Sequence, residues 1–173
     1  MISKKVALII GAGDYLGAAI AKRFAKDGFH SVGTRRRGDI TSFVEKIKNN
    51  GGDATGIHSD ARKENQVVEL VEHVEQNIGP IEVLVFNVGG NVMFPILETT
   101  TRVYKKVWEM CAFAGFLSGR EVAKRMVNRK KGTILFTGAT ASIRGSSGFS
   151  AFAGGKHALR ALAQSMAKEF MPH

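Results

Sequence analysis

Residues 5–17 read KVALIIGAGDYLG, a continuous apolar run that passes directly into a glycine-rich turn. The run from Lys5 to Ile10 is typical of a parallel strand that is buried on both faces. Apolar residues then recur at helical spacing, at Leu16, Ala19, Ile20 and Phe24. The segment therefore predicts a strand, a tight turn and an amphipathic helix in immediate succession.

The glycines of this turn fit a phosphate-binding role. Gly11, Gly13 and Gly17 would let the backbone turn tightly and approach a pyrophosphate. The helix that begins near Tyr15 and Leu16 would stabilise the phosphate charge with its N-terminus. Glycines at this density also occur in plain turns, but the preceding buried strand and the following helix favour a dinucleotide-binding turn formed by these five residues.

The rest of the chain repeats the alternation of strand and helix. Further strands are predicted at residues 30–34, 54–59, 82–86 and 133–137. Helical periodicity marks residues 40–47 and 67–78, a long helix from Thr101 to Asn128, and a final helix over 151–170. This order predicts an α/β, doubly wound parallel sheet in a single domain over residues 1–173, with ligands bound at the carboxyl ends of the strands.

The composition and charge of the chain indicate which binding partners and which cellular compartment to expect. The net charge of +10 could signal nucleic acid, but the basic residues are dispersed and lack interleaved aromatic residues, so we predict no nucleic-acid partner. There is no apolar stretch long enough for a membrane span and no cleavage site near the start, so we expect a cytoplasmic protein without a membrane partner. The single Cys111 is interpreted as core packing, and no metal site is expected.

The end of the second predicted strand bears on cofactor choice. An acid that binds a ribose 2′-hydroxyl is expected there, about 20 residues after the glycine turn. The sequence instead reads Gly-Thr-Arg-Arg-Arg over residues 33–37. A fork made by Arg35 and Arg36 would suit a 2′-phosphate, so we predict NADP(H) in preference to NAD(H). A solvated basic turn is the alternative, and comparing the two dissociation constants distinguishes them.

Four segments taken in order resemble the short-chain dehydrogenase/reductase family, from Val6 to about Phe170. Gly11 and Gly17 match the outer glycines of the family's Gly-x-x-x-Gly-x-Gly turn, with Tyr15 at the middle position. The other three segments are Ser-Asp-Ala at residues 59–61, Phe-Asn-Val-Gly at 86–89, and the lysine of a Tyr-x-x-x-Lys motif at 156. The resemblance implies a Rossmann-like NAD(P)-binding domain.

The resemblance also implies a role for each matched residue. Asp60, followed by Ala61, would contact the adenine, and Asn87 with Gly89 would close the fourth strand beside the cofactor. Lys156 would hold the nicotinamide ribose.

The catalytic positions of the family are replaced in this chain. Phe152 stands where the family has its catalytic tyrosine, Ala139 where it has the serine that orients the substrate oxygen, and Ala112 aligns with the supporting asparagine. A phenyl ring has no transferable proton, and positioned acid-base catalysis contributes typically ~10²–10⁴-fold in rate. Thr140, Ser142, Ser150 and His157 are interpreted as structural or solvated residues.

The chain also lacks the last strands and the substrate-binding loop of the family. Strand five would then form an apolar edge that another chain has to cover. A naturally short product and a fragment of a longer protein both remain open. The long helix from Thr101 and the final helix match the family's dimer interface, which implies a homodimer or tetramer.

We therefore predict an NADP(H)-binding, short-chain dehydrogenase-like oxidoreductase for a carbonyl or alcohol, with impaired catalysis. The alternative is a catalytically inactive NADP(H)-binding sensor or partner subunit. The substrate stays undetermined, because the family's pocket residues lie mostly in the part that this chain lacks.

Overall fold

The computed structural model describes residues 4–171 and contains one parallel sheet of five strands. The strands are β1 (Val6–Ile10), β2 (His30–Arg35), β3 (Asp53–His58), β4 (Ile81–Phe86) and β5 (Thr133–Phe136). Their order is β3-β2-β1-β4-β5, and every neighbouring pair is parallel. The direction of winding reverses between β3 and β4, so β1 and β4 flank the position where doubly wound sheets bind their ligands.

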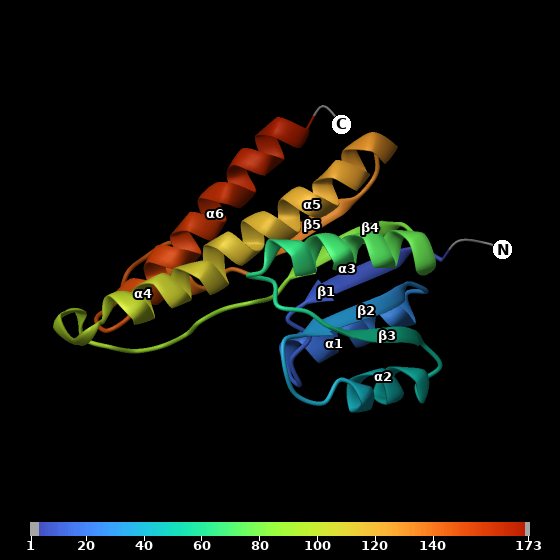
Figure 1. Cartoon of the computed structure of the whole chain (residues 1–173), viewed down its shortest axis with the longest axis horizontal. Coiled ribbons are helices and arrows are strands. Elements are labelled where there is room, and N and C mark those ends of the chain that lie inside the picture. The colour runs from blue at the N-terminus through green and yellow to red at the C-terminus, as the bar shows by residue number, and fades with distance from the viewer. Residues whose placement is uncertain (1–3, 172–173) are drawn as a thin grey trace.

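Helices cover both faces of the sheet (Figure 1), and residues 4–171 contain six α-helices. They are α1 (Leu16–Lys26), α2 (Thr41–Lys48), α3 (Glu64–Asn77), α4 (Thr101–Trp108), α5 (Ala114–Arg129) and α6 (Ser150–Phe170). Of these, α4 packs on α6 beyond the end of the sheet. Side chains of α1 and α2 pack with one face of the strands, around Ile9 and Phe43. Side chains of α3, α5 and α6 pack with the other face, around Leu8 and Phe86. The doubly wound α/β fold expected from the sequence is therefore confirmed.

The long helix predicted from Thr101 to Asn128 is interrupted in the structure. A π-helical segment, Glu109–Phe113, joins α4 to α5. Such segments insert one extra residue into a helical turn and often occur at functional sites. Apolar spacing of three and four residues cannot reveal this insertion, because the inward face continues on both sides of it. Cys111 is fully buried there, in agreement with its interpretation as core packing.

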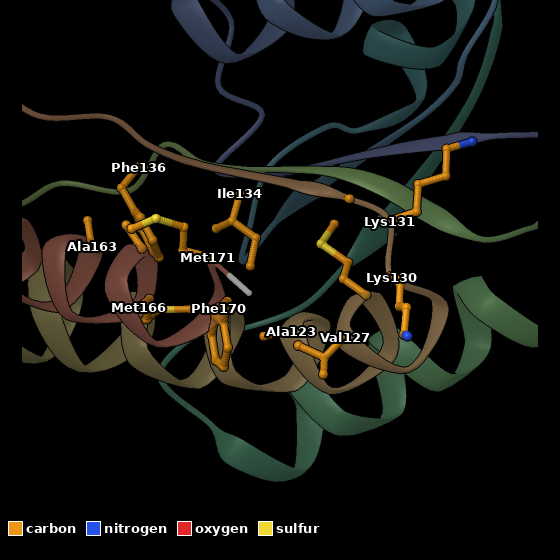
Figure 2. A pocket seen from close by; sticks show the side chains of 13 residues that line it. Ala123, Val127, Lys130, Lys131, Ile134, Phe136, Ala163, Met166, Phe170 and Met171 are labelled. Carbon is orange, nitrogen blue, oxygen red and sulfur yellow. The ribbon is translucent and has the colours of Figure 1, made fainter. Parts of the chain in front are cut away.

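An apolar groove lies beside β5, at the edge of the sheet. It has a volume of about 350 Å³ and is lined by β5 and by the later turns of α5 and α6. Figure 2 shows Ile134 and Phe136 of β5 facing Met166 and Phe170 of α6 across this groove. The buried residues of α6 all lie in its first half, up to Leu159. The second half of α6 therefore leaves apolar side chains partly exposed next to the edge strand.

Within residues 4–171, none of the helices has both the length and the apolar character needed to cross a bilayer.

Candidate nucleotide-binding site

Gly11 and Gly17 shape the turn between β1 and α1 by steric necessity. Gly11 has φ +89°, and a Cβ there would lie 2.7 Å from the carbonyl oxygen of Asn87. A Cβ at Gly17 would lie 2.3 Å from the carbonyl oxygen of Gly11. Gly13 differs, because a Cβ there would meet nothing within 4 Å. Gly11 and Gly17 thus allow neighbouring backbone segments to come close together, whereas a side chain at Gly13 would meet no other atoms.

The N-terminus of α1 is open to solvent. Tyr15 is 90% exposed and Leu16 is 54% exposed. The first turn of α1 carries no acidic side chain. The dipole of α1 therefore favours an anion at this end.

Asn87 ties the end of β4 to the glycine turn. Its Nδ2 donates to the carbonyl oxygen of Gly11 at 3.1 Å, and its backbone N–H donates to Ile10 at 2.8 Å. An open cavity of about 710 Å³ lies alongside, lined by the glycine turn, the end of β2 and the residues from Asn87 to Gly89. The structure thus brings Gly11, Gly13, Asn87 and Gly89 together around one cavity at the carboxyl ends of the strands.

Arg35 is held within the protein by three hydrogen bonds. Its guanidinium donates to the carbonyl oxygens of Ala12 and Asp39 and to the carboxylate of Asp14, each at 2.6 Å. This side chain is only 12% exposed and clamps the glycine turn to the start of α2. Arg36, by contrast, is exposed and lines a second cavity beside Asp60. Of the two arginines expected to form a fork, Arg36 is the exposed one, whereas Arg35 is held by the protein.

The second cavity lies at the ends of β2 and β3. It has a volume of about 170 Å³, and its lining includes Asp60, Ala61, Arg62, Val88 and Met110. The Asp60 carboxylate accepts hydrogen bonds from Arg62 Nε at 2.8 Å and Nη2 at 2.5 Å. These hydrogen bonds from Arg62 lower the pKa of Asp60 from its ordinary value of 3.8 to about 2. Asp60 and Ala61 were predicted from the sequence, but Arg62 was not. The only hint of its pairing with Asp60 is that the two residues are two positions apart.

The Asp60 pair has a measurable acid-stability consequence. Because the pKa of Asp60 falls from 3.8 to about 2 on folding, its ion pair contributes at most about 2 kcal/mol above pH 4, which is lost as the pH falls toward 2. The free energy of unfolding in urea should therefore differ between wild type and Asp60→Asn by about this amount at pH 6, with the difference shrinking between pH 4 and 2. Asp27→Asn, which breaks an exposed pair with Arg23, is the control and should change stability by under about 1 kcal/mol. A difference for Asp60→Asn that stays constant over this range would contradict the assignment.

Lys156 and Phe152 lie against Gly89, next to the first cavity. A Cβ at Gly89 would be 3.7 Å from Lys156 Cε and 3.8 Å from Phe152 Cε2. Lys156 Nζ donates to the carbonyl oxygens of Thr137 at 2.7 Å and Val88 at 3.1 Å, which links the ends of β4 and β5. Burial lowers the pKa of Lys156. Of positions 139, 152 and 156, only 156 carries an ionisable side chain. Lys156 is buried, and its ammonium group points to the carboxyl ends of β4 and β5.

The hydroxyl groups near these positions do not replace the missing tyrosine. Ala139 is exposed, and its backbone N–H donates to Ser142 Oγ at 3.0 Å. Ser150 Oγ is buried and has no hydrogen-bond partner among residues 4–171. His157 is hydrogen-bonded through Nδ1 to Ala153 of its own helix at 2.9 Å. Among residues 4–171, no hydrogen bond joins the side chain of Ser142, Ser150 or His157 to a side chain that could act as its base.

A parallel doubly wound sheet with a glycine turn after its first strand is the arrangement of a Rossmann-type α/β fold. A family model described as short chain dehydrogenase matches residues 5–173. The chain belongs to this family of oxidoreductases, whose members bind nicotinamide cofactors and are commonly oligomeric.

Three known proteins illustrate the similarity. The 2-dehydro-3-deoxy-D-gluconate 5-dehydrogenase of Formosa agariphila is 30% identical over 171 residues, which cover 98% of this chain and 65% of that protein. The crystal structure of a short-chain dehydrogenase from Rhodopseudomonas palustris is 52% identical with a TM-score of 0.93, over 97% of this chain and 79% of that one. The actinorhodin polyketide ketoreductase with NADPH is 25% identical with a TM-score of 0.93, over 96% and 65% of the two chains. This chain thus spans just under two thirds of the length of the curated relatives it matches first.

Proposed function

We propose that the protein binds NADP(H) across the carboxyl ends of β1, β2 and β4, and that it is a carbonyl or alcohol oxidoreductase with impaired turnover. The observation that carries the proposal is the combination of a turn shaped by Gly11 and Gly17 and Lys156 with Phe152 and Ala139 in place of hydroxyl-bearing residues. The relative that is complexed with NADPH supports the choice of cofactor. A sensor or partner subunit that binds NADP(H) without turnover is the second candidate, supported by the same replacements.

Selection of the 2′-phosphate is assigned to Arg36. Because the Arg35 guanidinium is engaged by Ala12, Asp14 and Asp39, Arg36 is the member of the pair that is available to a phosphate. Arg36→Ala should raise the dissociation constant for NADPH by about tenfold, the order of one charge-assisted contact, and should change that for NADH by under about threefold. Fluorescence titration of both cofactors measures this, with Arg23→Ala, at an exposed pair on α1, as the charge-matched control. Equal weakening of both cofactors would contradict the assignment.

We also propose that the chain forms a homodimer or tetramer through α4, α5 and α6. The exposed aromatic side chains Trp108 and Phe116 lie on this helical segment, and Phe113 stacks between them with centroid distances of 6.2 Å to each. An apolar surface of this kind is typical of a contact between subunits. Light scattering at micromolar concentration should give at least twice the mass of one chain. A monomeric mass would contradict this arrangement.

A further inference from the structure

The open edge of β5 has backbone groups and apolar side chains side by side. β5 lies at one end of the sheet order, so only β4 pairs with it among residues 4–171. The backbone N–H of Thr137, just after β5, donates to Phe86 of β4 at 2.9 Å. Alternate residues of a parallel strand direct their N–H and C=O groups to opposite neighbours, so those of Ile134 and Phe136 point toward the open edge. The side chains of the same two residues line the apolar groove beside β5.

The later turns of α6 form the opposite wall of this groove. Figure 2 shows Met166 and Phe170 across the groove from Ile134 and Phe136, and both α6 side chains are partly exposed. A strand added beside β5 would lie beneath α6 and bury them. A second copy of the chain, related by a two-fold axis at this edge, would bring its own α6 over the same pair of strands. The space beneath α6 therefore suits one extended segment better than a second copy.

The groove has a positively charged end. Figure 2 shows Lys130 and Lys131 at one end of the groove and Ala163 at the other. Lys131 pairs with Glu82 at 2.8 Å, whereas no acidic side chain among residues 4–171 forms an ion pair with Lys130. A positive charge beside an apolar strand edge favours a segment with an acidic residue at the matching end.

We propose that the β5 edge binds an extended segment of another polypeptide, which adds a further strand parallel to β5. Alternate residues of this segment are apolar and fill the groove, and an acidic residue at its amino end meets Lys130. Main-chain hydrogen bonds to Ile134 and Phe136 supply affinity, and the groove selects the side chains. The added strand also covers an edge that would otherwise favour aggregation. This surface is separate from the nucleotide-binding site, so the proposal does not depend on NADP(H) binding.

A synthetic peptide of about ten residues, within the usual length of a strand, tests this proposal. It has a pair of glutamates at its amino end, followed by alternating valine and threonine, and a fluorescent label at its carboxyl end. Fluorescence anisotropy should show saturable binding to the 173-residue chain, with a dissociation constant below about 100 µM. Ile134→Ala removes part of the groove wall and should weaken binding by at least about fivefold. Leu135→Ala is the matched control, because Leu135 is 46% exposed and does not line the groove, and it should change binding by under about twofold.

Charge reversal tests the acidic end of the segment. Lys130→Glu should weaken binding of the glutamate peptide by about threefold or more, and should strengthen binding of an otherwise identical peptide with lysines in place of the glutamates. Lys26→Glu, at an exposed position on α1, should change neither constant, and circular dichroism verifies the fold of each variant. No saturable binding to folded wild type, or equal weakening by Ile134→Ala and Leu135→Ala, would overturn the proposal. Absence of peptide binding together with a chain mass that Ile134→Ala lowers in light scattering would assign this edge to a second copy instead.

Discussion

Gly17→Ala is expected to weaken NADPH binding by at least about 100-fold. The added Cβ would lie 2.3 Å from the carbonyl oxygen of Gly11 and 2.7 Å from Cα of Ala12, distances that no side-chain rotation can relieve because both partners are backbone atoms. The turn has to open, which moves its N–H groups away from the phosphate positions. A loss of this size corresponds to about 2.7 kcal/mol of binding free energy.

Gly13→Ala is the matched control for this experiment. It adds the same methyl group to the same turn, yet a Cβ there meets nothing within 4 Å and the residue has no positive φ. We expect it to fold as wild type and to bind NADPH within about threefold of wild type, as measured by fluorescence titration. If Gly13→Ala and Gly17→Ala weakened binding equally, the steric account of the turn would be contradicted.

Restoring the family's catalytic groups is expected to have the second large effect, and only in combination. Phe152→Tyr alone supplies a phenol, but Ala139 still offers no hydroxyl to the substrate oxygen. We therefore expect the single variant to change NADPH-dependent reduction of diacetyl, a small activated ketone, by under about tenfold. Phe152→Tyr with Ala139→Ser should increase it by ~10²–10⁴-fold, the range typical of positioned acid-base catalysis.

The position of Phe152 supports this expectation. Its ring lies against Gly89 and near Lys156, as the two 3.8 Å distances from the Gly89 Cβ position to Phe152 Cε2 and to Lys156 Nζ show. A phenol there would therefore lie on the same side of Gly89 as the ammonium group. Ala139→Ser alone serves as the control and should stay near wild type, because it supplies no proton donor. A large gain from Phe152→Tyr alone would show that the rest of the site is already competent.

Much of the fold followed from local sequence patterns. The apolar run of β1, the glycine turn and the alternation of strands and helices specify the parallel sheet, because buried parallel strands and amphipathic helices have distinct periodicities. The strand ends shifted by only a residue or so, as at β3, which begins at Asp53 instead of Ala54. The π-helical segment after Trp108 was missed, since its single inserted residue leaves the apolar pattern on either side intact.

The site was less accessible from sequence than the fold. The sequence has three consecutive arginines at residues 35–37. Only the three-dimensional contacts show that the Arg35 guanidinium is hydrogen-bonded to Ala12, Asp14 and Asp39. Arg62 escaped notice for a similar reason, because its pairing with Asp60 depends on the backbone conformation between them. Gly11 and Gly17, whose positions in the turn follow from backbone geometry, were predicted from the sequence, whereas the side-chain contacts of Arg35 and Arg62 were not.

Titration of the purified chain with NADPH and NADH tests the central claim most directly. Energy transfer from Trp108 or the tyrosines to the reduced nicotinamide reports binding without any turnover. The account predicts saturable binding of NADPH with a dissociation constant at least about tenfold lower than that of NADH. Equal or tighter binding of NADH, or no binding of either cofactor to a chain shown to be folded, would contradict it.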